Sequence, residues 1–451
     1  MIKSLKRAVL LCSCMICGCL LCLTGCRNAD GAAESTATSQ SAFKNIPELR
    51  SGAVINVSDT DTKGAMKPVY DPDMKLEMVT RDSLLNSGFA MSDDGCYELY
   101  LNSDGNARMI YTDLEAGVSN WLSDSKFYDQ AGDSASLDDT ACCFEDALGG
   151  ATVFTADHKL FSVLFGCDTP SSIFVSDLDG RNKRALVTLS DYELLSGAVA
   201  CDSEYLYTLV TNGDNKTEAI RIDMETGAIE TCFTLSEANV FLVGAFDDCL
   251  IIKTIVRPDM IDAKDTEEIY KNSIHKVYRC SLINKQITEI KQWKQDQAFE
   301  AFDGQYMQLI DVVSGNLVTV DLKTGKSEVR ATLAELGIDG EDADTLMPIY
   351  DNHLICPMKD DTYKAIDLTT LKVTTLGYIE NTYNFPMIQG EFGDKFLVTV
   401  GNDIVPTPDH APDGTPITTD VHWPKKALIE KKDYWNGNYN LQAITNAYLD
   451  N

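Results

Sequence analysis

Several chemical signatures are missing from this chain of 451 residues. It contains no G-x-S-x-G sequence, which excludes the nucleophile elbow of a serine hydrolase. It has five histidines, and none of them are spaced as HxxxH or HxH. The acidic stretch Asp59–Gly64 starts like a calcium loop, but Lys63 stands at a ligand position and Tyr70 where a bidentate Glu is needed. The sequence therefore predicts no catalytic constellation, no metal site and no cofactor.

Cysteine is frequent but is not arranged for chemistry. Of 15 cysteines, five lie within residues 12–22 and one is Cys26, which leaves nine. No pair among these nine has CxxC spacing. Cys232, Cys280 and Cys356 lie inside apolar, strand-like runs, where cysteine behaves as a small hydrophobe. We expect mostly free, buried thiols with at most one or two disulfides.

Long apolar runs are absent except for Ala8–Leu23. Three cations precede this run within residues 3–7, and the small pair Thr-Gly and then Cys26 follow it. Its length falls short of the roughly 20 residues of a transmembrane helix. The whole order resembles the signal peptide and lipobox of bacterial lipoproteins. That resemblance implies cleavage of residues 1–25, a diacylglycerol on Cys26, and a lipid-anchored protein on the extracytoplasmic side of the cell membrane.

Positive charge is in short supply. Without residues 1–25 the chain carries 35 Lys and Arg against 69 Asp and Glu, a formal charge of −34. Nucleic acid would be repelled, and an anionic bilayer would attract no part of the body beyond the lipid. Residues 26–45 are small and polar, as in a flexible tether, whereas residues 46–451 have a globular composition. We expect a monomer with no nucleic-acid partner.

After the tether, short alternating apolar runs are closed by turns, a pattern typical of an all-β protein. The clearest unit, Glu204–Leu235, holds three strands and the turn Glu-Thr-Gly, and another apolar run precedes it. Six further copies start at Lys159, Gln305, His353, Cys96, Cys249 and Lys395. Seven units of about 53 residues predict a seven-bladed β-propeller with four-stranded blades.

One repeat carries a family resemblance. Ile173–Leu186 (IFVSDLDGRNKRAL) resembles the repeat of WD-like propellers, including those of the Tol system and of bacterial surface lipoproteins of unknown function. The resemblance implies a fold and not an activity. Gly-His and Trp-Asp signatures are absent, and four tryptophans are too few for quinoprotein docking repeats. The turn aspartates Asp177, Asp223, Asp321 and Asp367 recur at equivalent positions, so we interpret them as structural.

Two insertions between second and third strands are the candidate binding elements: Val256–Ile274 in the fourth unit and Gly401–Pro424 in the seventh. We expect them on one face, nearly opposite each other, where they either clamp a ligand or shield the channel. The Trp423 ring is either packed down as an anchor or exposed to stack on a ligand, and Arg257 would attract an acidic group. The candidate ligand-binding residues are Arg257, His410, His422 and Trp423.

The preferred hypothesis is a non-enzymatic, membrane-tethered propeller that binds a peptide, glycan or partner protein. The alternative is a lactonase- or quinoprotein-like enzyme with its site in the central channel. A separate hydrolase domain, as in prolyl peptidases, is not expected because the last unit ends near Asn451. We further expect first strands such as Leu195–Ala200 and Val240–Phe246 to line the channel. Met74–Thr80 alternates weakly and could join the last blade as an added strand beside Tyr439–Asn446, although that blade already looks complete without it.

Overall fold

A computed structural model defines the architecture of the chain. It describes residues 54–56, 69–80, 88–101, 107–122, 143–144, 150–166, 169–235, 239–257, 272–340, 343, 346–380, 382, 384–410 and 416–447. Ser51–Asn451 form one compact unit. The expected signal peptide, tether and lipidation residue Cys26 lie outside the described residues. Within the described part, no helix has the length and apolar character needed to cross a membrane.

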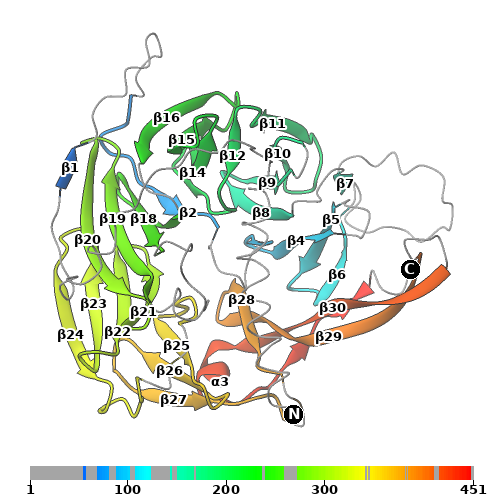
Figure 1. The fold of residues 1–451 in the computed structure, drawn as a ribbon. Helices are drawn as coiled ribbons and strands as arrows, with labels where there is room; N and C mark the ends of the chain where they lie inside the picture. The colour runs from blue at the N-terminus through cyan, green and yellow to red at the C-terminus, as the bar shows by residue number, and fades with distance from the viewer. Residues whose placement is uncertain are drawn as a thin grey trace. The chain divides into compact units, whose positions relative to one another are not determined.

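The described strands form seven sheets placed around a ring, and the strands within each blade are antiparallel. This arrangement confirms the predicted seven-bladed β-propeller (Figure 1). Blade 1 contains β3 (Phe89–Met91), β4 (Gly95–Leu101), β5 (Ala107–Asp113) and β6 (Val118–Trp121). Blade 2 contains β8 (Ala151–Ala156), β9 (Lys159–Leu164), β10 (Ser172–Asp177) and β11 (Arg184–Thr188). Blade 3 contains β13 (Ala200–Cys201), β14 (Tyr205–Asn212), β15 (Thr217–Asp223) and β16 (Ile229–Leu235).

The remaining blades follow in chain order. Blade 4 contains β17 (Val240–Phe246), β18 (Cys249–Val256), β19 (Ile274–Ser281) and β20 (Gln286–Lys294). Blade 5 contains β21 (Ala298–Asp303), β22 (Tyr306–Asp311), β23 (Asn316–Asp321) and β24 (Ser327–Thr332). Blade 6 contains β25 (His353–Pro357), β26 (Tyr363–Asp367) and β27 (Val373–Leu376). Blade 7 contains β28 (Met387–Phe392), β29 (Lys395–His410), β30 (Pro416–Glu430) and β31 (Gln442–Ala443).

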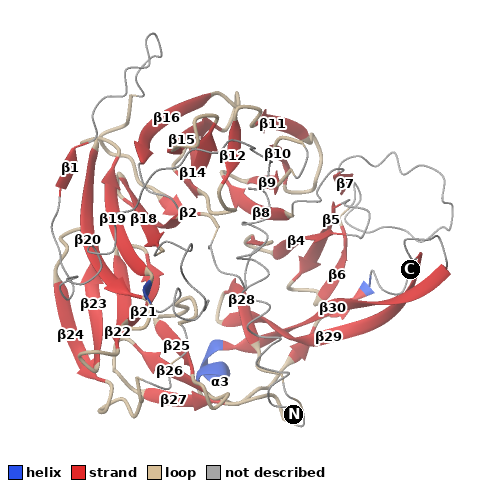
Figure 2. Cartoon of the chain, viewed as in Figure 1, coloured by secondary structure: helices blue, strands red, loops and turns tan. Residues whose placement is uncertain are grey.

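Short elements supplement the blades, and helix is almost absent from the described residues (Figure 2). β7 (Cys143–Phe144) pairs with β5, and β12 (Tyr192–Leu194) pairs with β14. β1 (Val54–Asn56) adds an outer strand to blade 4 by pairing with β20. The helix α3 (Lys431–Trp435) follows β30. In blade 6 the inner position is irregular: Met347 N–H donates to Ile355 O at 3.0 Å, without a continuous strand.

Apolar side chains alternate along the strands and pack blade against blade, as the period-2 pattern predicted. In blade 2, for example, Phe154 and Phe161 stack at 5.1 Å, and both belong to the same buried cluster as Leu206 and Ile220 of blade 3. The predicted strand positions of three cysteines are also confirmed. Cys232, Cys280 and Cys356 lie in β16, β19 and β25, and all three are free thiols.

Three of the four turn aspartates bond to backbone N–H groups of their own turn, as predicted. The fourth, Asp177, accepts hydrogen bonds from the side chains of Lys159 and Asn182. Asp223 Oδ1 accepts hydrogen bonds from the N–H groups of Glu225 at 3.0 Å and Thr226 at 2.7 Å. Gly227 then adopts φ +73° and donates its N–H to Asp223 O at 2.9 Å. Asp321 and Asp367 repeat these contacts in blades 5 and 6. Because successive strands of a blade are antiparallel, the first-to-second connections lie on the same side of the ring as these third-to-fourth turns. We name this side the turn face. The second-to-third connections lie on the other side, the insertion face.

The expected place of Met74–Thr80 is wrong. Its strand β2 (Glu77–Met78) pairs with β13 of blade 3, with Met78 opposite Ala200. β2 is therefore the innermost strand of blade 3. Within the predicted channel-lining segment Leu195–Ala200, Ala200 belongs to β13 and is covered by β2 on the side where the channel was expected. In blade 4, β17 is innermost as expected. Weak alternation marks a strand but cannot tell which free sheet edge it joins.

The ring closes at its outer rim instead. β31 extends blade 7, and the next strand, β32 (Thr445–Asn446), pairs in parallel with β6 of blade 1. Between these two blades, the buried Lys426 Nζ lies 2.8 Å from Glu98 Oε1 and 3.0 Å from Thr112 Oγ1. The C-terminal segment and this buried ion pair thus join the last blade to the first.

Candidate functional site

The Gly401–Pro424 insertion is a two-stranded ribbon, not the loop that its composition predicted. β29 and β30 remain paired with each other beyond the part of blade 7 in which β29 also pairs with β28. This pairing runs from Gly401 opposite Lys425 to His410 opposite Pro416. Of its five prolines, Pro412 lies outside the described residues. The other four all fall in the same alternate set of cross-strand pairs: Pro406, Pro408, Pro416 and Pro424. In every second pair of an antiparallel ladder the N–H groups point away from the partner strand, so prolines there remove no ladder bond.

One face of the ribbon is packed against blade 1. The Trp423 side chain is 9% exposed, and its ring stacks on Tyr100 at 4.1 Å and meets Trp121 edge-on at 6.0 Å. Val405 and Ile110 complete this cluster. The structure therefore places the Trp423 ring as a packed anchor, and a role for it in ligand binding stays a prediction. The contact holds the described part of the ribbon against the neighbouring blade.

The opposite face of the ribbon is open. Asn402, Ile404, Pro406 and His422 are exposed, and along β29 they alternate with the half-buried residues 401, 403 and 405. Ile404 is 57% exposed and stands directly opposite His422. Two of the predicted site residues, His422 and Trp423, thus lie on opposite faces. His410 is the last residue of β29, and its side chain lies outside the described residues.

Arg257 is exposed at the end of β18, and residues 258–271 of its insertion lie outside the described residues. Near the same end of this strand, Lys253 forms an ion pair with Glu300 of β21, and His275 Nδ1 lies 3.8 Å from Glu300 Oε1. Burial acts to raise the pKa of Glu300, but Lys253 and His275 outweigh it and lower that pKa to about 2. Glu300 is therefore ionised at neutral pH and binds blade 5 to blade 4 at the insertion face.

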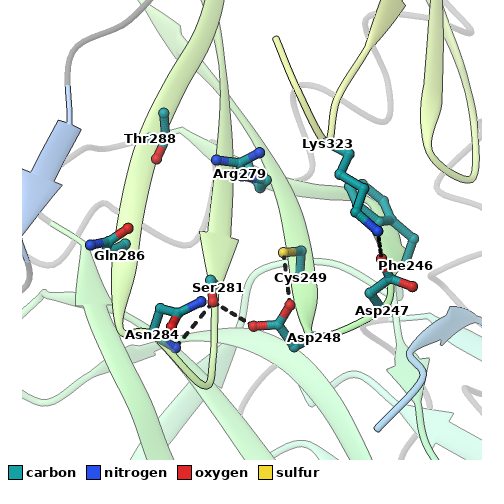
Figure 3. A pocket seen from close by; sticks show the side chains of 10 residues that line it. All are labelled: Phe246, Asp247, Asp248, Cys249, Arg279, Ser281, Asn284, Gln286, Thr288 and Lys323. Atoms are coloured by element: carbon teal, nitrogen blue, oxygen red, sulfur yellow. Dashed lines mark hydrogen bonds and ion pairs between the residues drawn. The ribbon is translucent and has the colours of Figure 1, made fainter. Parts of the chain in front are cut away.

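A cavity of about 270 Å³ opens on the turn face, between blade 4 and the β23–β24 turn of blade 5 (Figure 3). Its polar lining includes Asp248, Cys249, Arg279, Ser281, Thr288 and Lys323. The pairing of β18 with β19 brings Cys249, Ser281 and Arg279 together, because residues two apart on a strand share a face. Sequence reasoning missed this site, and the one available signal was an arginine inside the apolar run Val277–Cys280.

Some of the side chains that line this cavity form ion pairs or hydrogen bonds with one another. Lys323 Nζ pairs with an Asp247 oxygen at 2.6 Å. Asp248 accepts hydrogen bonds from the Ser281 hydroxyl and, at 3.4 Å, from the Cys249 thiol. Burial, together with Asp248, raises the pKa of Cys249 to about 12, so the thiol is protonated and a poor nucleophile. No group of three or more His, Cys, Asp or Glu side chains in the described ranges is placed to hold a metal ion.

Comparisons with known proteins return structural likenesses alone: no family model matches the chain, and no curated protein matches its sequence. An oligogalacturonate lyase in complex with manganese matches with TM-score 0.43 and 12% identity, over 83% of this chain and 98% of the lyase. A Pyrococcus horikoshii acylaminoacyl peptidase matches with TM-score 0.43 and 11% identity, over 84% of this chain and 54% of the peptidase. A prolyl endopeptidase matches with TM-score 0.44 and 11% identity, over 80% and 55%.

The chain thus spans about half the length of the peptidases it matches. None of these similarities is high enough to transfer an activity, a substrate or a metal to this chain. The sheet topology by itself assigns the fold, and the protein is a seven-bladed β-propeller.

Proposed function

We propose that this chain is a lipid-anchored, extracytoplasmic propeller that binds a peptide or protein partner through the open face of the β29–β30 ribbon. The observation that carries the proposal is Ile404, an aliphatic side chain that is 57% exposed on an element held down by Trp423. A pre-organised element loses little conformational entropy when a partner binds. Exposed apolar area next to polar groups such as His422 is typical of a contact surface.

A peptide or protein partner is favoured over a glycan. Sugar rings are bound by stacking on exposed aromatic faces, but the Trp423 ring is already covered by Tyr100. The open face offers instead an aliphatic side chain, Ile404, and an imidazole, His422. Arg257, His410 and His422 remain candidate contacts of the partner, and kinship with WD-like or Tol-system propellers remains part of the proposal.

Site-specific photo-crosslinking in living cells tests the proposal. A photoreactive phenylalanine analogue replaces Ile404 in one variant and Val329 of β24 in the control, because these side chains are 57% and 58% exposed. We expect a crosslinked protein or peptide at position 404 and none at position 329. Equal capture at both positions, or none at position 404, would contradict a partner at the ribbon.

The anchor and the location require a test of their own. The lipobox-like segment ending at Cys26 motivates them. Labelling with a fatty-acid analogue should modify the natural chain and not Cys26→Ala, and undiminished labelling of that variant would exclude lipidation at Cys26. The alternative, an enzyme of the lactonase or quinoprotein type, would be favoured by stoichiometric calcium or quinone in the purified chain.

A further inference from the structure

Two opposite charges line the turn-face cavity without neutralising each other. Arg279 of β19 is partly buried, and its guanidinium has no hydrogen-bond or ion-pair partner among the described residues. Asp248 is held by the Ser281 hydroxyl and the Cys249 thiol, and no cation described in the structure pairs with it. Lys323 and Asp247 also line the cavity, but these two charges neutralise each other in an ion pair. Partly desolvated charges without counter-charges favour a ligand that supplies them.

The strand register sets the spacing of these two charges. Ser281 is paired with Cys249, and Arg279 is paired with Ile251. These rows are two residues apart, which is about 7 Å along a strand, and their side chains share one face. Asp248 is bound at the Ser281 row, and in Figure 3 Cys249 lies between Asp248 and Arg279. This interval suits a ligand whose two charges are a few bonds apart, with a hydrogen bond of about 2.8 Å at each end.

The rest of the cavity limits the size of the ligand. Its volume of about 270 Å³ lies just under the roughly 300–1,000 Å³ of pockets for drug-sized molecules. Thr288 and Gln286 of β20 add neutral polar groups, and Phe246 adds an apolar wall. A polymer segment is too large for such a space, and a bare ion would leave one of the two charges without a counter-charge.

We propose that this cavity binds a small zwitterion of the α-amino acid class, with the ligand carboxylate on Arg279 and its ammonium group on Asp248. The planar guanidinium fork matches a carboxylate in bidentate geometry. The Asp248 carboxylate has acceptor positions beyond the two already used, so it can receive an ammonium donor. This site lies on the turn face and does not depend on the partner proposed for the ribbon.

Calorimetric titration of the full chain in detergent tests the proposal with the standard L-amino acids as probes. At least one should bind with a stoichiometry of one per chain. Two analogues of that amino acid then separate its charges: the acid that lacks the amino group and the amine that lacks the carboxyl group. Each should bind at least about tenfold more weakly, because each loses a charge-assisted hydrogen bond. Failure of every amino acid to bind, or equal binding of the acid analogue, overturns the proposal.

Variants test the two assigned residues. Arg279→Gln and Asp248→Asn should each weaken binding at least about tenfold while unfolding temperature and near-ultraviolet circular dichroism stay unchanged. Lys159→Gln is the matched control, because it breaks an ion pair with Asp177 at the corresponding turn of blade 2. Its affinity should match that of the natural chain. If Asp248→Asn fails to fold, Arg279→Gln still decides the question, since that side chain has no described partner to lose, and unchanged binding by it contradicts the assignment.

Discussion

At the turn between the third and fourth strands of a blade, aspartate and glycine contribute in different ways. Asp223 and Asp321 accept backbone N–H groups two and three residues ahead, so the turn is formed locally. Gly227 and Gly325 follow at φ +73° and +72°, the left-handed region in which a side chain is strained. These contacts are short in sequence, which is why single residues could be assigned before any tertiary structure was known.

The two glycines allow backbone strain to be separated from crowding. A Cβ at Gly325 would have Ile290 Cδ1 as its nearest neighbour at 3.9 Å, whereas one at Gly227 would collide with the Leu186 carbonyl oxygen. Gly325→Ala should therefore lower the free energy of unfolding by about 1–2 kcal/mol, the cost of the left-handed conformation. Gly227→Ala should lower it further. Urea unfolding of both variants measures the difference. Equal losses would show that the Leu186 backbone shifts away from the new Cβ at little cost in free energy.

At the scale of elements, the ribbon and the blade it continues are held by different forces. Within blade 7 the strands β28 to β31 pair edge to edge, whereas beyond Gly401 β29 pairs with β30 alone. An isolated two-stranded ribbon has marginal stability. Its position therefore depends on side-chain packing against blade 1, in which Trp423 is the largest buried group. Such an element is expected to open without unfolding of the ring.

Replacement of this anchor should act locally. In Trp423→Ala, amide hydrogen exchange in residues 401–410 and 416–424 should accelerate, while the unfolding temperature changes little. Trp293→Ala is the control, because Trp293 is 3% exposed within blade 4 and its removal should cost about 3–5 kcal/mol of global stability. Exchange measured by mass spectrometry and thermal unfolding separate the two. A large fall in unfolding temperature for Trp423→Ala with unchanged exchange in the ribbon would show that the ribbon is part of the core.

At the scale of the whole molecule, closure of the ring depends on contacts between residues far apart in the sequence. Lys426 and Glu98 have side chains that are 0% and 10% exposed and join blade 7 to blade 1. Thr112 and Ser119 satisfy the same ammonium group. The parallel strand β32 adds backbone bonds between the C-terminal segment and β6. The pair is buried deeply enough that either charge left alone would be costly.

Breaking this ion pair from one side should destabilise the closed ring. Lys426→Met leaves Glu98 as an uncompensated buried charge and should cost about 3–5 kcal/mol in the free energy of unfolding. Lys426→Met combined with Glu98→Leu should regain much of that loss, because both charges are then absent. Lys323→Met, in an exposed pair with Asp247, should cost at most about 1 kcal/mol. Urea unfolding compares the three variants. A double variant as unstable as Lys426→Met would mean that the lost stability comes from side-chain packing and not from an unpaired buried charge.

Local information sufficed for the blades. Alternating apolar residues and the turns at Asp177, Asp223, Asp321 and Asp367 determined the second, third and fourth strands and the number of units, since both are short-range effects. The free, buried state of Cys232, Cys280 and Cys356 followed from the same runs, apart from the partial exposure of Cys232. The proline content of Gly401–Pro424 misled, because composition does not reveal which cross-strand pairs the prolines occupy.

The tertiary structure decided everything that depends on which edges and faces meet. Only spatial packing assigned β2 to blade 3, β32 to blade 1 and the Trp423 ring to a buried cluster. Arg279 and Asp248 lie 31 positions apart in the sequence, and the register of β18 with β19 brings them to one cavity. The sequence of a strand, or a charged residue in it, does not specify which strand edge or which opposite charge it will meet. That choice is made by shape and charge complementarity between segments that meet only when the ring closes.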